Sequence, residues 1–284
     1  MWCTGTHSEA QWELNRLELG PFTLQHGHVG AANLVMGEPL PSGGLIYLLG
    51  QSEGASRFNG QAISGGNAVL FEPGHDFCLS HAHPHDWFTI RTTQPAPAQG
   101  SHTLLHEARR VEPLLRTVTS LMATAAEAPG LAASPAGTVG RRILEARLSR
   151  LSGPGAASEP SPAPAQGRPP RARQAILEAC HDVLGELDHT PVSVNELAQA
   201  CSVSARTLQT VFNDYFGFGP SRFLQYRQLY RVHRDLVEAD PATATVSDIL
   251  LSHGVWSFSH FSRRYRALFG QTPGHTLRRG GPGI

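Results

Sequence analysis

Two stretches in the last third of the chain repeat one pattern of hydrophobic and polar positions. The first runs SARTLQTVFNDYFGFGP from Ser204, and the second runs SFSHFSRRYRALFGQTP from Ser257, at an offset of 53 residues. The matching landmarks are Ser204, Leu208, Phe212, Phe216, Gly217 and Pro220 in the first copy and Ser257, Phe261, Tyr265, Phe269, Gly270 and Pro273 in the second. Apolar residues recur every four positions, as on one buried helix face, and Gly followed by Pro ends a helix. The pattern predicts two helices, each capped by its serine.

A short helix and a turn precede each copy. Leu197-Ala198 followed by Ser202-Val203 aligns with Ile249-Leu250 followed by Gly254-Val255, at an offset of 52 residues. Ser193 and Glu196 have the spacing of a capping box, which starts the first short helix. Each unit is therefore predicted as helix, turn and helix, so that two helix-turn-helix motifs lie in tandem.

The second helix of each unit carries hydrogen-bonding side chains opposite its apolar stripe. At i, i+3, i+4 and i+7 these are Arg206, Gln209, Thr210 and Asn213 in the first copy and Ser259, Ser262, Arg263 and Arg266 in the second, with His260 beside them. A helix lying in the DNA major groove needs such a face. For one copy alone, a solvated helix face is the simpler interpretation. Its occurrence in both units favours DNA binding.

A longer helix is predicted between the two units. The run PSRFLQYRQLYRVHRDLVEA (220–239) begins with Pro220, which suits a first helical turn. About 19 helical residues at a 1.5 Å rise span roughly 28 Å, close to one DNA turn of about 34 Å. This helix is therefore expected to hold both groove-binding helices over successive segments of one DNA face. Another helix is predicted over 173–187.

From about residue 20 to 95 the chain alternates short apolar runs with turn residues. The runs LIYLL (45–49), AVLFE (68–72) and WFTIR (87–91) are typical of strands, and Asn59-Gly60 between strand-like flanks predicts a hairpin. Many short strands at close spacing indicate a small barrel or sandwich.

Helical periodicity follows the strands over 102–122 and 141–151. It leaves two interpretations open: helices packed on the barrel, or a subunit interface. Residues 152–172 are rich in Pro, Ala and Gly and carry almost no large apolar side chains, so they are predicted to link two domains.

Charge is distributed unevenly along the chain. The net charge is zero, with 23 basic residues, all Arg, and 23 acidic ones. Residues 200–279 hold 10 Arg against 5 acidic residues, so a positive balance coincides with the repeats and suits a polyanionic partner. The four cysteines (Cys3, Cys78, Cys180 and Cys201) have no paired spacing, which argues against a disulfide framework or a zinc finger. Neither a signal peptide nor a membrane helix is apparent, so a cytoplasmic protein is expected.

A histidine cluster in the first part raises a second hypothesis. Its members are His26, His28, His75, His81, His83 and His85. His81 and His83 resemble the paired ligands of metal-binding cupins, whose strand alternation points both imidazoles inward. Such sites also need a carboxylate further on, whereas Asp86 comes too early and Pro84 breaks the strand. A polar loop at the barrel mouth is therefore preferred, and no metal, cofactor or catalytic residue is predicted.

The C-terminal part resembles the AraC/XylS family of bacterial transcription regulators. The resemblance rests on the tandem motifs, the connecting helix with Arg227 and the run GVWSFSHFSRRYRALFGQTPGHTLRR, and it covers residues 173–279. This ending is similar to the branch containing ethanolamine-operon activators, as are Leu229, Val232, His233 and Arg234 in the connecting helix. Two positions depart from the family: Val255 replaces the usual Phe as a smaller core residue, and Thr210 stands where a longer polar residue is common.

The resemblance implies which residues contact DNA. By position, the base contacts are Arg206, Gln209 and Thr210 from the first unit and Phe258, Ser259, Ser262 and Arg263 from the second. The helix N-termini at Ser204 and Ser257 would face phosphates. Asn213, His260 and Arg266 complete the expected interface, and Arg231 on the connecting helix is expected to add charge.

The combined prediction is an α+β protein of two domains. Residues 1–151 form a cupin-like β-barrel with following helices, residues 152–172 a linker, and residues 173–284 an all-α domain with two helix-turn-helix motifs. The resemblance implies a transcriptional activator that binds double-stranded DNA, a small-molecule effector in its N-terminal domain and RNA polymerase, and that forms a homodimer. The alternatives are a metal-dependent cupin enzyme or metal sensor joined to a DNA-binding module, and an architectural DNA-binding protein.

Overall fold

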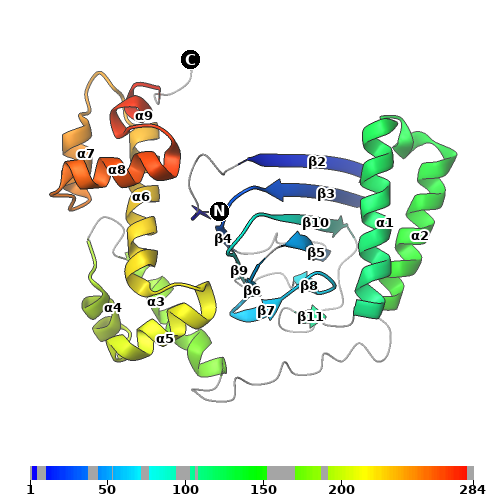
Figure 1. Cartoon of the computed structure of the whole chain (residues 1–284), viewed down its shortest axis with the longest axis horizontal. Coiled ribbons are helices and arrows are strands. Elements are labelled where there is room, and N and C mark those ends of the chain that lie inside the picture. Colours follow the sequence, from blue (N-terminus) through cyan, green and yellow to red (C-terminus); the bar gives the residue numbers. More distant parts are fainter. Residues whose placement is uncertain are drawn as a thin grey trace. The chain divides into compact units, whose positions relative to one another are not determined.

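The computed structural model describes residues 2–4, 11–37, 44–52, 54–71, 77–93, 103–105, 108–151, 170–186 and 191–279. The chain forms two compact units, one within Gln11–Ser161 and one within Pro162–Ile284, and the short strand β1 (Trp2–Cys3) groups with the second. Figure 1 shows strands and two helices in the first unit and helices in the second. A β-rich N-terminal part and a helical C-terminal part are thus confirmed. Most of the predicted linker, residues 152–169, lies outside the described residues.

The described strands of the first unit form two antiparallel sheets. They are β2 (Trp12–Leu19), β3 (Phe22–Val29), β4 (Asn33–Gly37), β5 (Gly44–Ser52), β6 (Ser56–Phe58), β7 (Gln61–Ile63), β8 (Ala68–Phe71), β9 (Phe77–His81), β10 (His85–Thr92) and β11 (Thr103–Leu105). One sheet has the order β11-β8-β5-β10-β3-β2, and the other contains β4-β9-β6-β7. Neither order closes on itself, so the described strands show no closed barrel, and the cupin-like β-barrel stays a prediction.

The six-stranded sheet is apolar on both faces because successive side chains of a strand point to opposite sides. On β5, Ile46 and Leu48 belong to one hydrophobic core, whereas Tyr47 and Leu49 belong to another. The second core also takes in Phe58 of β6 and side chains of β7 and β9, so it lies between the two sheets. Near-continuous apolar runs such as LIYLL are therefore strands buried on both faces.

Helices α1 (Ala108–Glu127) and α2 (Pro135–Leu151) cover the other face of the six-stranded sheet (Figure 1). The α1 stripe of Val111, Leu114, Val118, Leu121 and Met122 is buried in the same core as β3, β5 and β10. The 102–122 stripe therefore packs on the sheet, which was one of the two interpretations. On α2, Leu144 and Leu151 join this core, whereas Ile143, which the periodicity over 141–151 placed in the same apolar stripe, is exposed.

The predicted hairpin connects β6 and β7. Phe58 pairs with Gln61, so the loop has two residues, Asn59 and Gly60. Both have positive φ, 46° and 79°, as a type I′ turn requires. The local signal was sufficient here because this turn depends on its own two residues.

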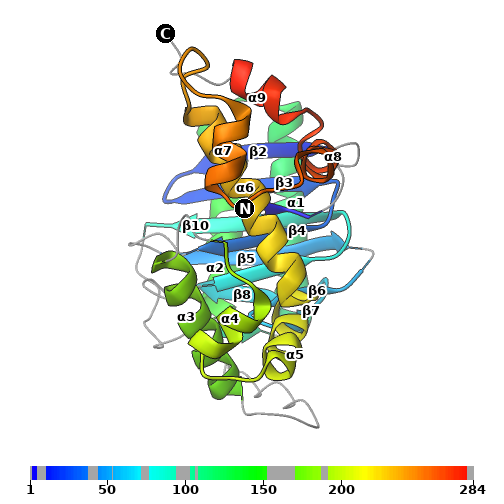
Figure 2. The same ribbon diagram turned by 90° about the vertical axis from the view of Figure 1, so that its left-hand side faces the viewer.

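The second unit contains seven helices among the described residues. They are α3 (Pro170–Glu186), α4 (Val194–Ala200), α5 (Ala205–Phe216), α6 (Pro220–Glu238), α7 (Val246–Ser252), α8 (Phe258–Phe269) and α9 (Pro273–Arg279). The short helices α4 and α7 have 7 residues each, and α5 and α8 have 12 each. The tandem helix-turn-helix prediction is confirmed. Figures 1 and 2 show α5 and α8 at opposite ends of α6.

Helix α6 contributes to the core beneath the second motif. Leu229, Val232 and Leu236 pack with Leu250 of α7 and with Phe261 and Tyr265 of α8. Because one rigid helix carries this core, α8 is fixed to α6 by side-chain packing.

None of the described helices is both long enough and apolar enough to cross a lipid bilayer.

Candidate nucleic-acid interface

Helices α5 and α8, the reading helices, each separate a buried apolar face from an exposed polar face. The buried residues are Leu208, Val211, Phe212 and Phe216 in α5 and Phe261, Tyr265 and Leu268 in α8. The sequence-predicted contact residues Arg206, Gln209, Thr210, Asn213, Ser259, His260, Arg263 and Arg266 are exposed, as are Ser204 and Ser257, and Ser262 is half-buried. The structure thus places these residues on one outward face in each motif.

The N-termini of the two reading helices are built differently. The Ser204 hydroxyl oxygen accepts a hydrogen bond from the Thr207 backbone N–H at 3.0 Å. Ser257 has φ −104° and ψ 81° instead of the extended backbone of a cap residue, and it makes no side-chain cap bond. The predicted serine cap is confirmed for α5 and wrong for α8, because capping needs the backbone geometry as well as the hydroxyl.

Left-handed residues shape the turn inside each motif and the end of each reading helix. Gly217 and Gly270 end α5 and α8 with φ of 81° and 71°, as predicted. The aligned turn residues Ser202 and Gly254 have φ of 53° and 67°. The two motifs therefore use one backbone path, with serine at a position where its partner has glycine.

Three polar side chains of α5 are already engaged within the helix. Gln209 Nε2 donates to Asn213 Oδ1 at 3.3 Å, and Thr210 Oγ1 donates to the Arg206 carbonyl oxygen at 3.0 Å. The Thr210 hydroxyl proton is used locally, so in this arrangement Thr210 can only accept a hydrogen bond from a ligand. Arg206 presents the free cationic donor group of this face.

At the start of α8, Phe258 behaves differently from its predicted role as a base contact. It is half-buried and packs against the core of the second motif. Val255 is buried in that core as well, as expected for the smaller residue at this position. The exposed cationic groups of α8 are Arg263 in its middle and Arg266 in its last turn.

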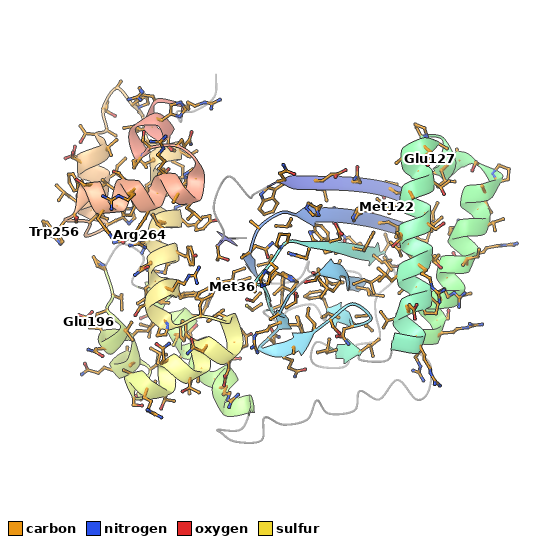
Figure 3. The ribbon with its side chains drawn as sticks, viewed as in Figure 1. Met36, Met122, Glu127, Glu196, Trp256 and Arg264 are labelled. Carbon is orange, nitrogen blue, oxygen red and sulfur yellow. The ribbon has the colours of Figure 1, made fainter. Side chains whose placement is uncertain are left out.

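Trp256 is a further candidate interface residue. In the sequence it stood out only as part of the run that resembles the AraC/XylS family. It lies between buried Val255 and Ser257, and its side chain is 83% exposed. Figure 3 shows it at the edge of the second unit, beside α8. The sequence held one signal for this role: Trp256 lies just before the start of α8, at a position outside the apolar period of that helix.

Polar contacts fix the second motif on α6. His253, in the turn between α7 and α8, lies with Nε2 2.7 Å from Asp235 Oδ2 of α6, and its carbonyl oxygen accepts from Gln228 Nε2 at 3.0 Å. Partial burial acts to raise the pKa of the Asp235 carboxyl, but bonding to His253 holds this pKa below its ordinary value. Tyr265 in α8 similarly bonds His233 of α6 and Thr276 of α9 through its hydroxyl, at 2.6 and 2.8 Å.

Arg231 is half-buried on α6, with its Nε and one terminal guanidinium nitrogen buried. That Arg231 adds charge to the interface stays a prediction. Arg227 turns inward and donates to the Leu184 carbonyl oxygen of α3.

Two histidines of the first unit, His81 and His85, form a buried pair and do not lie in the predicted polar loop. His81, at the end of β9, and His85, at the start of β10, stack with ring centroids 3.7 Å apart and are 2% and 3% exposed. His81 Nδ1 lies 2.9 Å from Ser56 Oγ, and its Nε2 lies 3.3 Å from the Tyr47 hydroxyl. His83 is exposed in the turn, so His81 and His83 do not both point inward as the paired ligands of metal-binding cupins do.

The remaining histidines are divided between other positions. His28 Nδ1 lies 2.9 Å from Asp86 Oδ1, and His75 lies outside the described residues. Where side chains are described, no three His, Cys, Asp or Glu groups come together as metal ligands.

We expect the stability of the protein to fall in acid because of the buried histidine pair. Burial lowers the pKa of His85 to about 4 and that of His81 well below its ordinary value. The unfolded chain, with a histidine pKa of about 6.5, therefore binds more protons, and stability is full above pH 6.5 and declines toward pH 4. His85 alone should cost about 2 kcal/mol at pH 4.5. The free energy of unfolding, measured with urea, should depend less on pH for His85→Gln than for the wild type. The control His83→Gln, at an exposed position, should show the pH dependence of the wild type. Equal pH dependence in all three proteins would contradict this expectation.

Comparison with known proteins gives a partial match that falls on the same region. Residues 197–279 match the helix-turn-helix domain family. A probable thc operon regulatory protein of Rhodococcus erythropolis is 31% identical over 110 residues, which are 39% of this chain and 33% of that protein. The XylDLEGF operon transcriptional activator 1 of Pseudomonas putida is 30% identical over 88 residues, 31% of this chain and 27% of that protein. This chain therefore covers a third or less of either relative's length.

A solved structure with similarity to this chain is that of a transcriptional regulator with an AraC-type DNA-binding domain from Chromobacterium violaceum. It is 28% identical, covers 40% of this chain and 99% of that one, and has a TM-score of 0.35. The matched residues 197–279 include both reading helices. They form the helix-turn-helix domain that the family match describes.

Proposed function

We propose that this chain, with its AraC-type helix-turn-helix domain, is a sequence-specific DNA-binding transcriptional regulator. The observation that carries the proposal is the pair of reading helices, equal in length, with exposed polar faces at opposite ends of one helix. A solvated surface does not require such a repeat, whereas two successive major-groove segments do. The 10 Arg against 5 acidic residues in 200–279 supply attraction to phosphates.

Individual residues are assigned roles by their position on the reading helices. Arg206 and Gln209 would contact bases from α5, and Ser259, Ser262 and Arg263 from α8. Thr210 would accept a hydrogen bond, and Asn213 would accept or donate one, at the edge of the α5 contact with DNA. His260 and Arg266 would lie along the α8 contact. Ser204 and Ser257 would meet phosphates, and for Ser257 the hydroxyl is not used as a cap. Phe258 would act by packing α8 in place.

We add Trp256 to this interface. A tryptophan 83% exposed at the start of α8 presents a large flat surface next to the groove-facing residues. Aromatic rings of this kind contact the sugar and base edges of nucleic acids and help to fix orientation on the backbone. In this role Trp256 would contribute affinity more than sequence preference.

The proposed output is activation of transcription through RNA polymerase. It is supported by the name of the Pseudomonas putida relative, a transcriptional activator, whose match includes 31% of this chain. The narrower resemblance to ethanolamine-operon activators rests on the C-terminal run and on α6 residues. Packing explains three of the α6 residues: Leu229 and Val232 are buried, and His233 bonds Tyr265. Those residues therefore carry no information on the effector.

The first unit is proposed to bind a small-molecule effector in a cupin-like manner. Support comes from the polar interior between its sheets, where Asn33 lies opposite His81 in the β4–β9 pair. The Asn33 amide is buried, and neither its oxygen nor its nitrogen has a hydrogen-bond partner within the described residues. A buried amide of this kind is costly unless a ligand or water satisfies it. Together with the neutral imidazoles, it favours an uncharged effector that both donates and accepts hydrogen bonds.

Footprinting of the full chain on its target promoter tests the proposed function. We expect two protected segments about one helical turn apart on one DNA face, at moderate salt. The logarithm of the affinity should fall linearly with the logarithm of salt concentration, with a slope near −0.9 per phosphate contact. Continuous protection without sequence preference would instead support the architectural hypothesis.

We also propose that the whole chain forms a homodimer through the outer side of α1 and α2. A hollow of about 620 Å³ lies between these helices and is lined by Thr117, Ile143 and Arg147 among others, with Val139 exposed on α2. An isologous contact of two copies would cover these apolar groups. In sedimentation experiments Ile143→Glu should shift the full chain from dimer to monomer, whereas Ser149→Glu, on α2 but outside the hollow, should not. A wild-type chain that is monomeric at high micromolar concentration would exclude this interface.

A further inference from the structure

Cys180 and Cys201 lie next to each other in the second unit, although 21 residues separate them along the chain. Their Sγ atoms are 3.1 Å apart. A disulfide bond is about 2.05 Å long, so closing the pair needs a movement of roughly 1 Å. The sequence showed no paired cysteine spacing, and only the packing of α3 against α4 brings these thiols together.

Several contacts fix the two thiols in this arrangement. Arg173 of α3 forms an ion pair with Asp214 of α5 at 3.0 Å. Arg227 of α6 bonds the Leu184 carbonyl oxygen at the other end of α3. The buried residues Ile176 and Leu184 lie one helical turn to either side of Cys180 on the same α3 face. The thiols therefore meet at a place where α3 is held at both ends.

The position of Cys201 connects the pair to the first motif. Cys201 is the C-cap residue of α4, directly before left-handed Ser202 and three residues before the Ser204 cap of α5. A covalent bond from α3 to this residue would restrain the turn that sets the direction of α5.

We propose that Cys180 and Cys201 form a reversible redox site, oxidised to an intramolecular disulfide by a low-molecular-weight disulfide such as glutathione disulfide. This inference does not depend on DNA binding. The half-buried Cys201 reacts first: its thiolate attacks one sulfur of glutathione disulfide, the S–S bond breaks, and one glutathione leaves with the proton. The Cys180 thiol then loses its proton and attacks Cys201 Sγ, which releases the second glutathione. Two protein thiols and one glutathione disulfide thus give one protein disulfide and two glutathione molecules.

The different environments of the two thiols support this order. Cys201 is partly accessible, whereas Cys180 is 2% exposed. Burial first, and then the neighbouring Cys201, raise the pKa of the Cys180 thiol above its ordinary value. Cys180 is therefore a poor first nucleophile for an external disulfide, but it is in place to attack a sulfur already attached to Cys201.

Thiol mapping of the full-length chain in glutathione redox buffers tests the proposal. After reduction, the protein is equilibrated at potentials from roughly −300 to −150 mV, alkylated and digested for mass spectrometry. We expect a peptide pair linked through Cys180 and Cys201, with a two-electron dependence on potential of about 30 mV per tenfold change. The thermal midpoint of the oxidised protein should rise by several degrees, because the link restricts the unfolded chain.

Single substitutions separate the two steps. In Cys180→Ser or Cys180→Ala, Cys201 should retain one glutathione, which the wild type does not accumulate. In Cys201→Ser, Cys180 should remain unmodified while the protein is folded. The proposal is overturned if no linked peptide forms at the most oxidising potential, if it forms only after unfolding in urea, or if the wild type and Cys180→Ala retain the same glutathione adduct. Buried Cys78 provides a reference thiol in each digest.

Discussion

Replacement of Arg263 with alanine is expected to abolish the preference for one base pair in the bound sequence. Arg263 is exposed in the middle of α8, on the same face as Ser259 and Ser262. An arginine at such a position can bond guanine O6 and N7 together, which contributes about 1–3 kcal/mol of discrimination. The loss should therefore appear as a roughly 10- to 100-fold drop in selectivity at one position.

The neighbouring Arg266 provides a matched control on the same helix. It lies in the last turn of α8 and is exposed as well. Since the base-contacting part of a reading helix is its N-terminal half, Arg266 should interact mainly with phosphates. Arg266→Ala should weaken binding to all sequences alike and reduce the salt slope by about one contact. Binding-site selection with both variants distinguishes the roles: if Arg263→Ala leaves the selected motif intact, α8 does not read DNA through this residue.

Arg206 in α5 should show the same behaviour at a separate part of the site. It is aligned with Ser259 of α8, so the two motifs do not place arginine at equivalent positions. Arg206→Ala should weaken the preference for one base pair in the other protected segment. The preference at the Arg263-dependent position should stay unchanged. Loss of both preferences in one variant would mean that the two motifs do not bind independently placed segments.

Replacement of Gly254 with alanine is expected to destabilise the second unit by about 2–4 kcal/mol. Gly254 has φ 67° in the turn between α7 and α8, and an added Cβ would lie 2.1 Å from Pro191 Cγ. The left-handed backbone alone costs an L-residue about 1–2 kcal/mol, and the rigid proline ring cannot move away as a flexible side chain would. Overpacking of this kind typically adds about 1–3 kcal/mol. Urea unfolding monitored by amide exchange in α7 and α8 would measure the loss.

Ser202 of the first motif aligns with Gly254, so the reverse substitution can be made there. Ser202 has φ 53°, so Ser202→Gly removes the left-handed strain, while glycine adds about 0.5–1 kcal/mol of chain entropy to the unfolded state. We expect a change between zero and about 1 kcal/mol toward greater stability. A Gly254→Ala protein as stable as the wild type would show that the turn can relax away from Pro191.

The sequence by itself determined the local architecture of the second unit and one hairpin of the first. The equal lengths of α5 and α8, the glycine ends at Gly217 and Gly270, the Ser193–Glu196 capping box and the Asn59-Gly60 hairpin all follow from residues within a few positions of each other. Interactions at i+3 and i+4, and turns that need positive φ, depend on neighbouring residues alone. The exposed reading faces were predictable for the same reason, since a period of 3.6 separates the two sides of a helix.

Tertiary structure alone decided the features that depend on residues far apart in the chain. Strand order divided the described strands of the first unit between two sheets, brought His81 against His85 and placed the α1 stripe on a sheet. Helix packing half-buried Arg231 and placed Cys180 beside Cys201, and the backbone of the second turn left Ser257 without its cap. Pairing of strands and docking of helices are set by the summed burial of whole faces, which no local pattern specifies. The composition and spacing of the chain therefore identified the two helix-turn-helix motifs, whereas its buried histidines and thiol pair were apparent only in the folded protein.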